Sequence, residues 1–191
     1  MTTLFSTILA AALAQNLLLD GLLGLCPALA LSRRHDVAAG MALLTLAALP
    51  ILILLGYTIQ VGVLRPLGAE SLTLIAWALL LTTLPAAAAT LLARLRPDLQ
   101  TPLGDYLPFF GFNCLVLGGV LLTSVRAESL VQAVGLAIGT AAGYAIVLLM
   151  LSALRERLAL TPLPAAMRGG AATLVTLGLF ALALTGLRGI L

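Results

Sequence analysis

The chain has 191 residues, of which 62% are hydrophobic and 9% are charged, and its mean hydropathy is +1.18. Soluble domains carry about 25% charged residues, so this composition excludes a single soluble core and predicts an integral membrane protein. The net charge of +3 comes from arginines spread over short polar stretches. These make no basic face, so nucleic-acid binding has little support.

Six apolar segments, each long enough to cross a bilayer, follow one another along the chain. Their expected bounds are residues 4–23, 37–61, 71–93, 105–125, 129–154 and 170–187. Pro50, Pro85 and Pro108 lie inside these segments and predict kinks, which lipid tolerates only where neighbouring groups recover the freed carbonyls. The first segment lacks a basic flank and a small-residue cleavage site, so we expect it to be retained. We predict an all-α integral membrane protein with a single membrane domain over residues 1–191.

The chain has two cysteines, and both lie in short motifs within apolar sequence: Leu23-Gly24-Leu25-Cys26-Pro27 and Gly111-Phe112-Asn113-Cys114-Leu115. In each motif a glycine precedes the cysteine by two or three residues, so the backbone there can bend or be approached closely. This pattern suggests ligands of a membrane-buried iron–sulfur cluster. Two thiolates cannot complete a cluster that needs four, so a second chain would have to supply the others. Packing as small hydrophobic residues is the ordinary alternative for either cysteine alone.

An internal repeat relates the two halves of the sequence. The cysteines lie 88 residues apart, and the same shift carries the second segment onto the fifth and the third onto the sixth. We predict two three-helix repeats, over about residues 1–96 and 97–191. Because three is odd, the repeats would cross the membrane in opposite senses, with broken first and fourth helices meeting near the midplane. An approximate two-fold axis would bring Cys26 and Cys114 together.

The arginines predict the orientation. The first, third and fifth loops carry seven arginines, and the opposite side carries three. The larger set comprises Arg33, Arg34, Arg94, Arg96, Arg155, Arg157 and Arg168, and the smaller comprises Arg65, Arg126 and Arg188. The positive-inside rule therefore places the odd loops in the cytoplasm and both termini in the periplasm of a bacterial inner membrane.

Two further stretches accompany the cysteine motifs: Leu117-Gly118, and Arg155-Glu156-Arg157-Leu158, which leads to Pro164 and Arg168-Gly169. Together with the cysteine motifs, they resemble the A subunits of the Rnf ion-translocating oxidoreductase complex. These belong with the D and E membrane subunits of the related sodium-pumping Nqr enzyme. The resemblance runs from about Asn16 to the C-terminus. Two departures are Gly111-Phe112, where the family usually has a Thr-rich stretch, and Arg33-Arg34, where it often has lysine.

This resemblance implies that Cys26 and Cys114 bind a [2Fe–2S] cluster jointly with two cysteines of a homologous partner, the Rnf E subunit, beside subunits B, C, D and G. It also implies electron transfer across the bilayer, from a cytoplasmic donor toward a periplasmic flavin. The complex would be of the ferredoxin:NAD oxidoreductase type and would move Na⁺ or H⁺. The chain shows no dinucleotide-binding glycine motif or flavin-attachment site, so it would hold no complete active site. A small secondary transporter with inverted repeats and a structural membrane subunit with packing cysteines are the alternatives.

Several polar residues carry two interpretations each. Asn16 and Asn113 are expected to make interhelical hydrogen bonds, and Asn113 could instead donate to a cluster sulfur. Asp20 is either a functional intramembrane acid or a residue at a helix end beside Gly21. His35 is expected to be solvated in a polar loop. The Arg155-Glu156-Arg157 stretch is explained by a positive-inside anchor, with docking of a cytoplasmic partner as the alternative.

Overall fold

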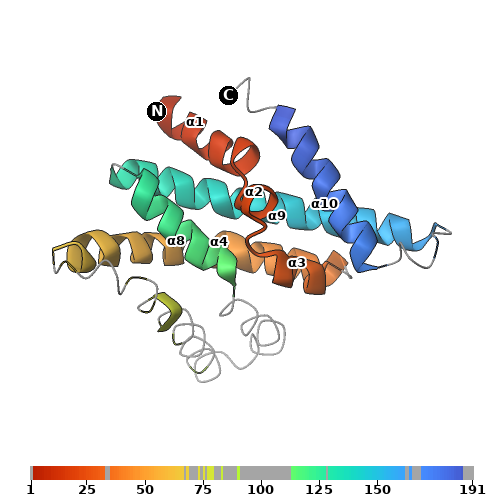
Figure 1. Cartoon of the computed structure of the whole chain (residues 1–191), viewed down its shortest axis with the longest axis horizontal. Helices are drawn as coiled ribbons and strands as arrows, with labels where there is room; N and C mark the ends of the chain where they lie inside the picture. The colour runs from red at the N-terminus through yellow and green to blue at the C-terminus, as the bar shows by residue number, and fades with distance from the viewer. Residues whose placement is uncertain are drawn as a thin grey trace.

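The computed structural model describes residues 2–32, 35–66, 68, 73, 75, 77–79, 83, 90, 113–127, 129–161, 164 and 169–186. Within these ranges the regular structure is helical throughout (Figure 1). In chain order the helices are α1 (Thr2–Leu9), the π-helix η1 (Ala10–Ala14), α2 (Leu17–Gly21), α3 (Leu25–Leu31), α4 (His35–Ile59), the π-helix η2 (Gln60–Leu64), α8 (Cys114–Arg126), α9 (Leu130–Ala159) and α10 (Gly170–Thr185).

Three described stretches are long and apolar enough to cross a bilayer, which agrees with a membrane-embedded protein. They are Leu4–Gly21, His35–Leu64 and Leu130–Ala159, and they correspond to the first, second and fifth predicted segments. Two shorter apolar helices, Cys114–Arg126 and Gly170–Thr185, correspond to the fourth and sixth. Residues 71–93, with Pro85, and residues 105–112, with Pro108, lie mostly or wholly outside the described part. Six spans and the two inverted repeats therefore stay predictions.

The first segment is interrupted, as the sequence predicted. After η1 the chain leaves helical geometry at Gln15, and the Asn16 side chain caps the start of α2. α2 ends at Gly21, and Leu22 and Gly24 then take left-handed backbone angles before α3 begins at Leu25. The segment is thus divided into short helices joined by two tight breaks.

The two long helices extend beyond their predicted bounds. α4 begins at His35, runs through Pro50 and continues as η2 to Leu64. α9 begins after Ser129, whose side chain accepts a hydrogen bond from the Gln132 amide, and it ends at Ala159. The Arg155 stretch, expected in a loop, therefore belongs to the last turns of a helix.

α9 lies at the centre of the bundle and contacts α1, η1, α2, α4, α8 and α10. It packs most extensively against α4, which runs beside it, and α8 crosses both (Figure 1). Glycines permit the close approach of α9 to the first segment. A Cβ atom at Gly139 would stand 2.7 Å from the Ile8 carbonyl oxygen, and one at Gly143 would stand 2.5 Å from the Ala12 carbonyl oxygen.

Arginines close the ends of the two helices that carry the cysteines. Arg155, near the end of α9, donates from Nη1 to the Leu29 carbonyl oxygen at 2.9 Å and to Ser32 Oγ at 2.6 Å, at the end of α3. Arg65, which follows η2, donates to the Ser124 carbonyl oxygen in the last turn of α8 at 2.9 Å. A cation at a helix C-terminus satisfies free carbonyls and complements the helix dipole.

The described part of the third segment reaches the core through Trp77, which is buried. Its indole Nε1 donates to Gln60 Oε1 at 3.2 Å, and Gln60 Nε2 donates to Thr73 Oγ1 at 3.3 Å. Both polar ends of the Gln60 amide are thus satisfied where α4 changes to the π-helix.

Large apolar side chains are exposed on the outer faces of α4 and α10. They include Leu43, Leu46, Ile51 and Leu55 on α4, and Leu174, Val175, Leu179 and Leu182 on α10. In water such surfaces would be a liability. In a bilayer, lipid tails would solvate them, which agrees with the composition.

The glycine contacts predict how packing responds to one added methyl group. Gly143→Ala should destabilise the protein by about 1–3 kcal/mol, because its Cβ would meet backbone atoms of Ala12. The matched control is Gly178→Ala in α10, where nothing lies within 4 Å, so helix stability should rise by about 0.5–1 kcal/mol. Thermal unfolding in detergent, followed by size-exclusion chromatography, measures both. Equal unfolding temperatures would contradict the close packing of α9 on η1.

Candidate functional site

Both cysteines lie in the first turn of a helix whose N-cap residue has non-helical backbone angles. Cys26 is the second residue of α3, and Cys114 is the first residue of α8. Both are free thiols, Cys26 exposed and Cys114 half-buried. The dipole at a helix N-terminus favours negative charge, which suits a thiolate ligand.

The turn before α3 brings the two cysteine motifs together. The Gly24 amide donates a hydrogen bond to Cys114 Sγ, and the nitrogen–sulfur distance is 3.0 Å. Because Gly24 caps α3 and precedes Cys26 by two residues, this bond joins the start of one cysteine helix to the thiol of the other. The predicted convergence of the two motifs is therefore present in the structure.

Only glycine suits position 24. Its φ of +84° lies in the left-handed region, where a side chain is strained. There is also no space for one, because a Cβ atom would stand 2.9 Å from Tyr144 Cε2, 3.1 Å from Leu115 Cβ and 3.4 Å from Asn113 Oδ1. The turn is thus enclosed by the start of α8 and by α9.

Asn113 caps the start of α8, and this was not foreseen. Its Oδ1 accepts a hydrogen bond from the Leu115 amide at 3.0 Å, and the residue is 1% exposed. Asn16 does the same for α2, accepting from Leu18 and donating from Nδ2 to the Ala12 carbonyl oxygen. Both bonding patterns are local, so the expectation of interhelical bonds was wrong for the contacts seen here.

The side-chain NH2 group of Asn113 has no hydrogen-bond partner. Its Nδ2 is buried without a hydrogen bond, although the residue is next to Cys114. A buried donor left unpaired costs roughly 1–3 kcal/mol, so such an atom calls for an acceptor. A sulfur-rich anionic group held by the two thiols would supply that acceptor.

The residues at this turn therefore fit an iron–sulfur group in the chemistry of their donors. They offer two thiols, one amide already donating to a thiol sulfur, and one unpaired donor. Among the described residues no group of three or more His, Cys, Asp or Glu side chains gathers to hold a metal. A four-thiolate ligand set would therefore need two thiols beyond Cys26 and Cys114.

The remaining predicted polar sites lie elsewhere. Asp20 is exposed in α2, and Gly21 ends that helix as expected. His35 begins α4 and is exposed. It lines an open hollow of about 390 Å³ with Glu156 and Arg157, whereas Arg155 is engaged with the end of α3. None of these side chains is part of the cysteine site as described.

Tyr144 is the residue that sequence reasoning missed. It is wholly buried on α9, and its hydroxyl donates to the Gly24 carbonyl oxygen at 3.4 Å. A tyrosine within a stretch of alanines and glycines was the available signal, because a buried phenol needs a polar partner.

Comparison with known proteins gives a family and full-length relatives. The family described as "Rnf-Nqr subunit, membrane protein" matches residues 4–191. The protein of Pseudomonas paraeruginosa named as the A subunit of the ion-translocating oxidoreductase complex is 36% identical over 192 residues, covering 100% of this chain and 99% of the relative. The protein of the same name from Pasteurella multocida is 34% identical over 190 residues, covering 100% and 99%.

The geometry of the turn predicts the reactivity of Cys114. In a Cys26→Ser background, Gly24→Ala should raise the rate of maleimide labelling at Cys114 severalfold, because strain and overlap would displace the amide from the sulfur. Gly68→Ala is the matched control, since Gly68 has a φ of +64° with nothing within 4 Å. Mass spectrometry of the detergent-solubilised chain measures both rates. An unchanged rate in Gly24→Ala would show that the turn does not restrain this thiol.

Proposed function

Because the chain belongs to the Rnf-Nqr family of membrane subunits, we propose that it is the A-type membrane subunit of an ion-translocating oxidoreductase complex. The observation that carries the site proposal is the bond between the Gly24 amide and Cys114 Sγ, beside the unpaired Nδ2 of Asn113. A packing cysteine needs neither feature. A thiol that binds an anionic cofactor uses both.

In this proposal Cys26 and Cys114 supply two thiolate ligands to a [2Fe–2S] cluster. Such a group, when bound, provides a one-electron carrier within the low-dielectric layer. The two remaining thiolates come from a homologous chain, the E subunit of the same complex. The exposure of Cys26 supports this sharing, because a ligand at an interface between chains is accessible in either chain alone.

Gly24 and Asn113 support the ligands. The Gly24 amide stabilises negative charge on the sulfur of Cys114, and the Asn113 Nδ2 group donates to a second sulfur of the bound group. Hydrogen bonds to cluster sulfurs favour the more negative, reduced state and so raise the reduction potential. Both residues also cap helices, and this fixes their donors before any cofactor binds.

The complex is proposed to be of the ferredoxin:NAD oxidoreductase type and to link that chemistry to Na⁺ or H⁺ movement. This chain would work with subunits B, C, D, E and G. A change of charge within a low-dielectric site alters which protein conformation is favoured, which supplies a route for coupling. The chain contributes ligands and donors rather than a complete active site.

We further propose a bacterial inner-membrane location with both termini in the periplasm. The four described arginines fall at opposite ends of the bundle, which supports the predicted grouping for these residues. Arg65 bonds to the last turn of α8, so it lies at the same end as Arg126. Arg157 lies at the other end, where it lines the hollow with His35.

The ligand assignment predicts the iron content of the purified complex. Cys26→Ser and Cys114→Ser should each remove most of the iron bound at this site and its electron paramagnetic resonance signal in the reduced state, because a hydroxyl is a poorer ligand than a thiolate. The chain expressed without its homologous partner should also be poor in iron, since two thiolates leave the ligand set incomplete.

Thr176→Ala in α10 is the control for handling and assembly, because its hydroxyl bonds only within its own helix to Ala172. It should keep the iron content of the unmodified complex. Full iron and an unchanged signal in both serine variants would overturn the ligand assignment. A complex without iron at this site in any form would favour a structural subunit or a transporter.

The orientation predicts the behaviour of reporter fusions. Alkaline phosphatase fused after Leu191 should be active, because it would reach the periplasm, whereas a fusion near Asp36, in the first turn of α4, should be inactive. Green fluorescent protein at the same two positions should give the reverse pattern and serves as the internal control. The opposite result would refute the orientation while leaving the ligand assignment untouched.

A further inference from the structure

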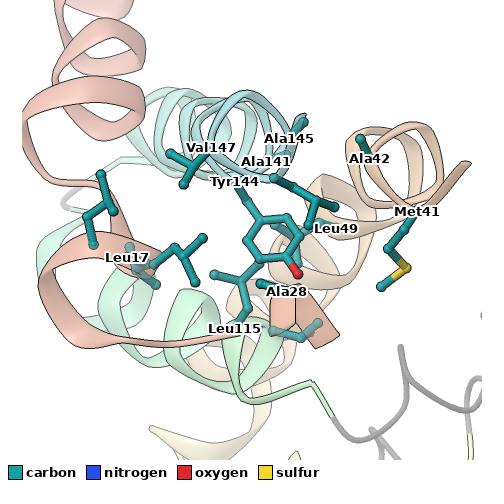
Figure 2. Packing of buried hydrophobic residues seen from close by; sticks show 14 of the residues in the cluster. Leu17, Ala28, Met41, Ala42, Leu49, Leu115, Ala141, Tyr144, Ala145 and Val147 are labelled. Carbon is teal, nitrogen blue, oxygen red and sulfur yellow. The ribbon is translucent and has the colours of Figure 1, made fainter. Parts of the chain in front are cut away.

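Tyr144 occupies the space between the two cysteine helices. It is fully buried and lies on α9, with its ring among Ala28 of α3, Leu115 of α8 and Leu49 of α4 (Figure 2). It belongs to the main hydrophobic cluster, yet it carries a polar hydroxyl at its tip. A phenylalanine would fill nearly the same volume, so packing alone does not account for a tyrosine.

The hydroxyl meets the backbone of Gly24. It donates to the Gly24 carbonyl oxygen at 3.4 Å, which is long for such a bond but is the contact that keeps this buried hydroxyl from being unpaired. The ring contacts the same residue on another side, because Cε2 lies 2.9 Å from the place that a Cβ atom would take. Two parts of one side chain therefore fix the orientation of one turn.

Gly24 passes this restraint on to Cys114. Its amide donates to Cys114 Sγ at 3.0 Å, so the angle of the turn sets the direction of that bond. A glycine, which has no side chain, could by itself leave its φ of +84° easily. The contacts with Tyr144 and its neighbours restrict this backbone freedom. A looser turn would leave the amide less well aligned with the sulfur.

We propose that Tyr144 is a positioning residue that sets the reduction potential of the group bound at Cys114, acting through Gly24. The inference rests on the proposed function, since it requires a redox group at the two cysteines. Tyr144 touches neither thiol by hydrogen bond. Its hydroxyl holds the Gly24 turn, and the aligned amide stabilises the more negative state of the sulfur ligand.

The test is a redox titration of the purified complex, followed by electron paramagnetic resonance. Tyr144→Phe should keep the iron content but lower the potential, by a threefold to tenfold change in the reduction equilibrium, or about 28–59 mV for one electron. Pulsed measurements of exchangeable-proton coupling should show a weaker coupling from the amide proton. Tyr57→Phe, a buried tyrosine of the separate smaller cluster, should change neither quantity.

Tyr144→Phe also leaves the volume of the hydroxyl unfilled. A second pair of variants separates the loss of the donor from this change in packing. 4-Aminophenylalanine at position 144 keeps a donor there and should retain a potential near that of the unmodified complex. 4-Methylphenylalanine fills the space without a donor and should lower the potential as Tyr144→Phe does. These two variants decide the question even if Tyr144→Phe assembles poorly.

The outcomes separate this inference from the proposed function. An iron signal in the unmodified complex with an unchanged or raised potential in Tyr144→Phe and in the 4-methyl variant would overturn the role of Tyr144 alone. Equal potentials in the 4-amino and 4-methyl variants would do the same. Absence of the iron signal from the unmodified complex would instead overturn the proposed function, and this inference with it.

Discussion

A helix interrupted inside a hydrocarbon layer exposes amide and carbonyl groups that lipid cannot satisfy, and this constraint governs the arrangement of the described residues. The chain meets it with side chains. Asn16 and Asn113 accept hydrogen bonds from amides at the starts of α2 and α8. Arg155 and Arg65 donate to carbonyls at the ends of α3 and α8. The breaks are therefore supported at both ends, and the cysteines can lie at helix starts without leaving the backbone unpaired.

The same constraint makes the site rigid before anything binds. Gly24 is enclosed by Tyr144 and Leu115, and its amide already donates to Cys114. A donor that is aligned in advance needs little rearrangement when charge arrives, and this is favourable for electron transfer in a medium of low dielectric constant. The exposed position of Cys26 leaves the opposite side of the site accessible to another chain.

The sequence predicted the long helices well, because apolar length is a property of the chain itself. It also predicted the break before Cys26 and the meeting of the two cysteine motifs, from glycine placement and the internal repeat. It did not predict the capping role of Asn113, because an amide in apolar sequence suits a local cap and an interhelical bond equally. The partners of Tyr144 and Arg155 lie more than a hundred residues away along the chain, so no local pattern identifies them.

The arginine contacts cross between the two halves of the chain. Arg65 follows the helices of the first half but closes α8 in the second, and Arg155 belongs to the second half but closes α3 in the first. Among the described residues, the C-terminal end of each cysteine helix therefore accepts its arginine from the other half of the chain. A chain divided between the two halves would lose both contacts, so the two parts are expected to depend on each other for stable folding.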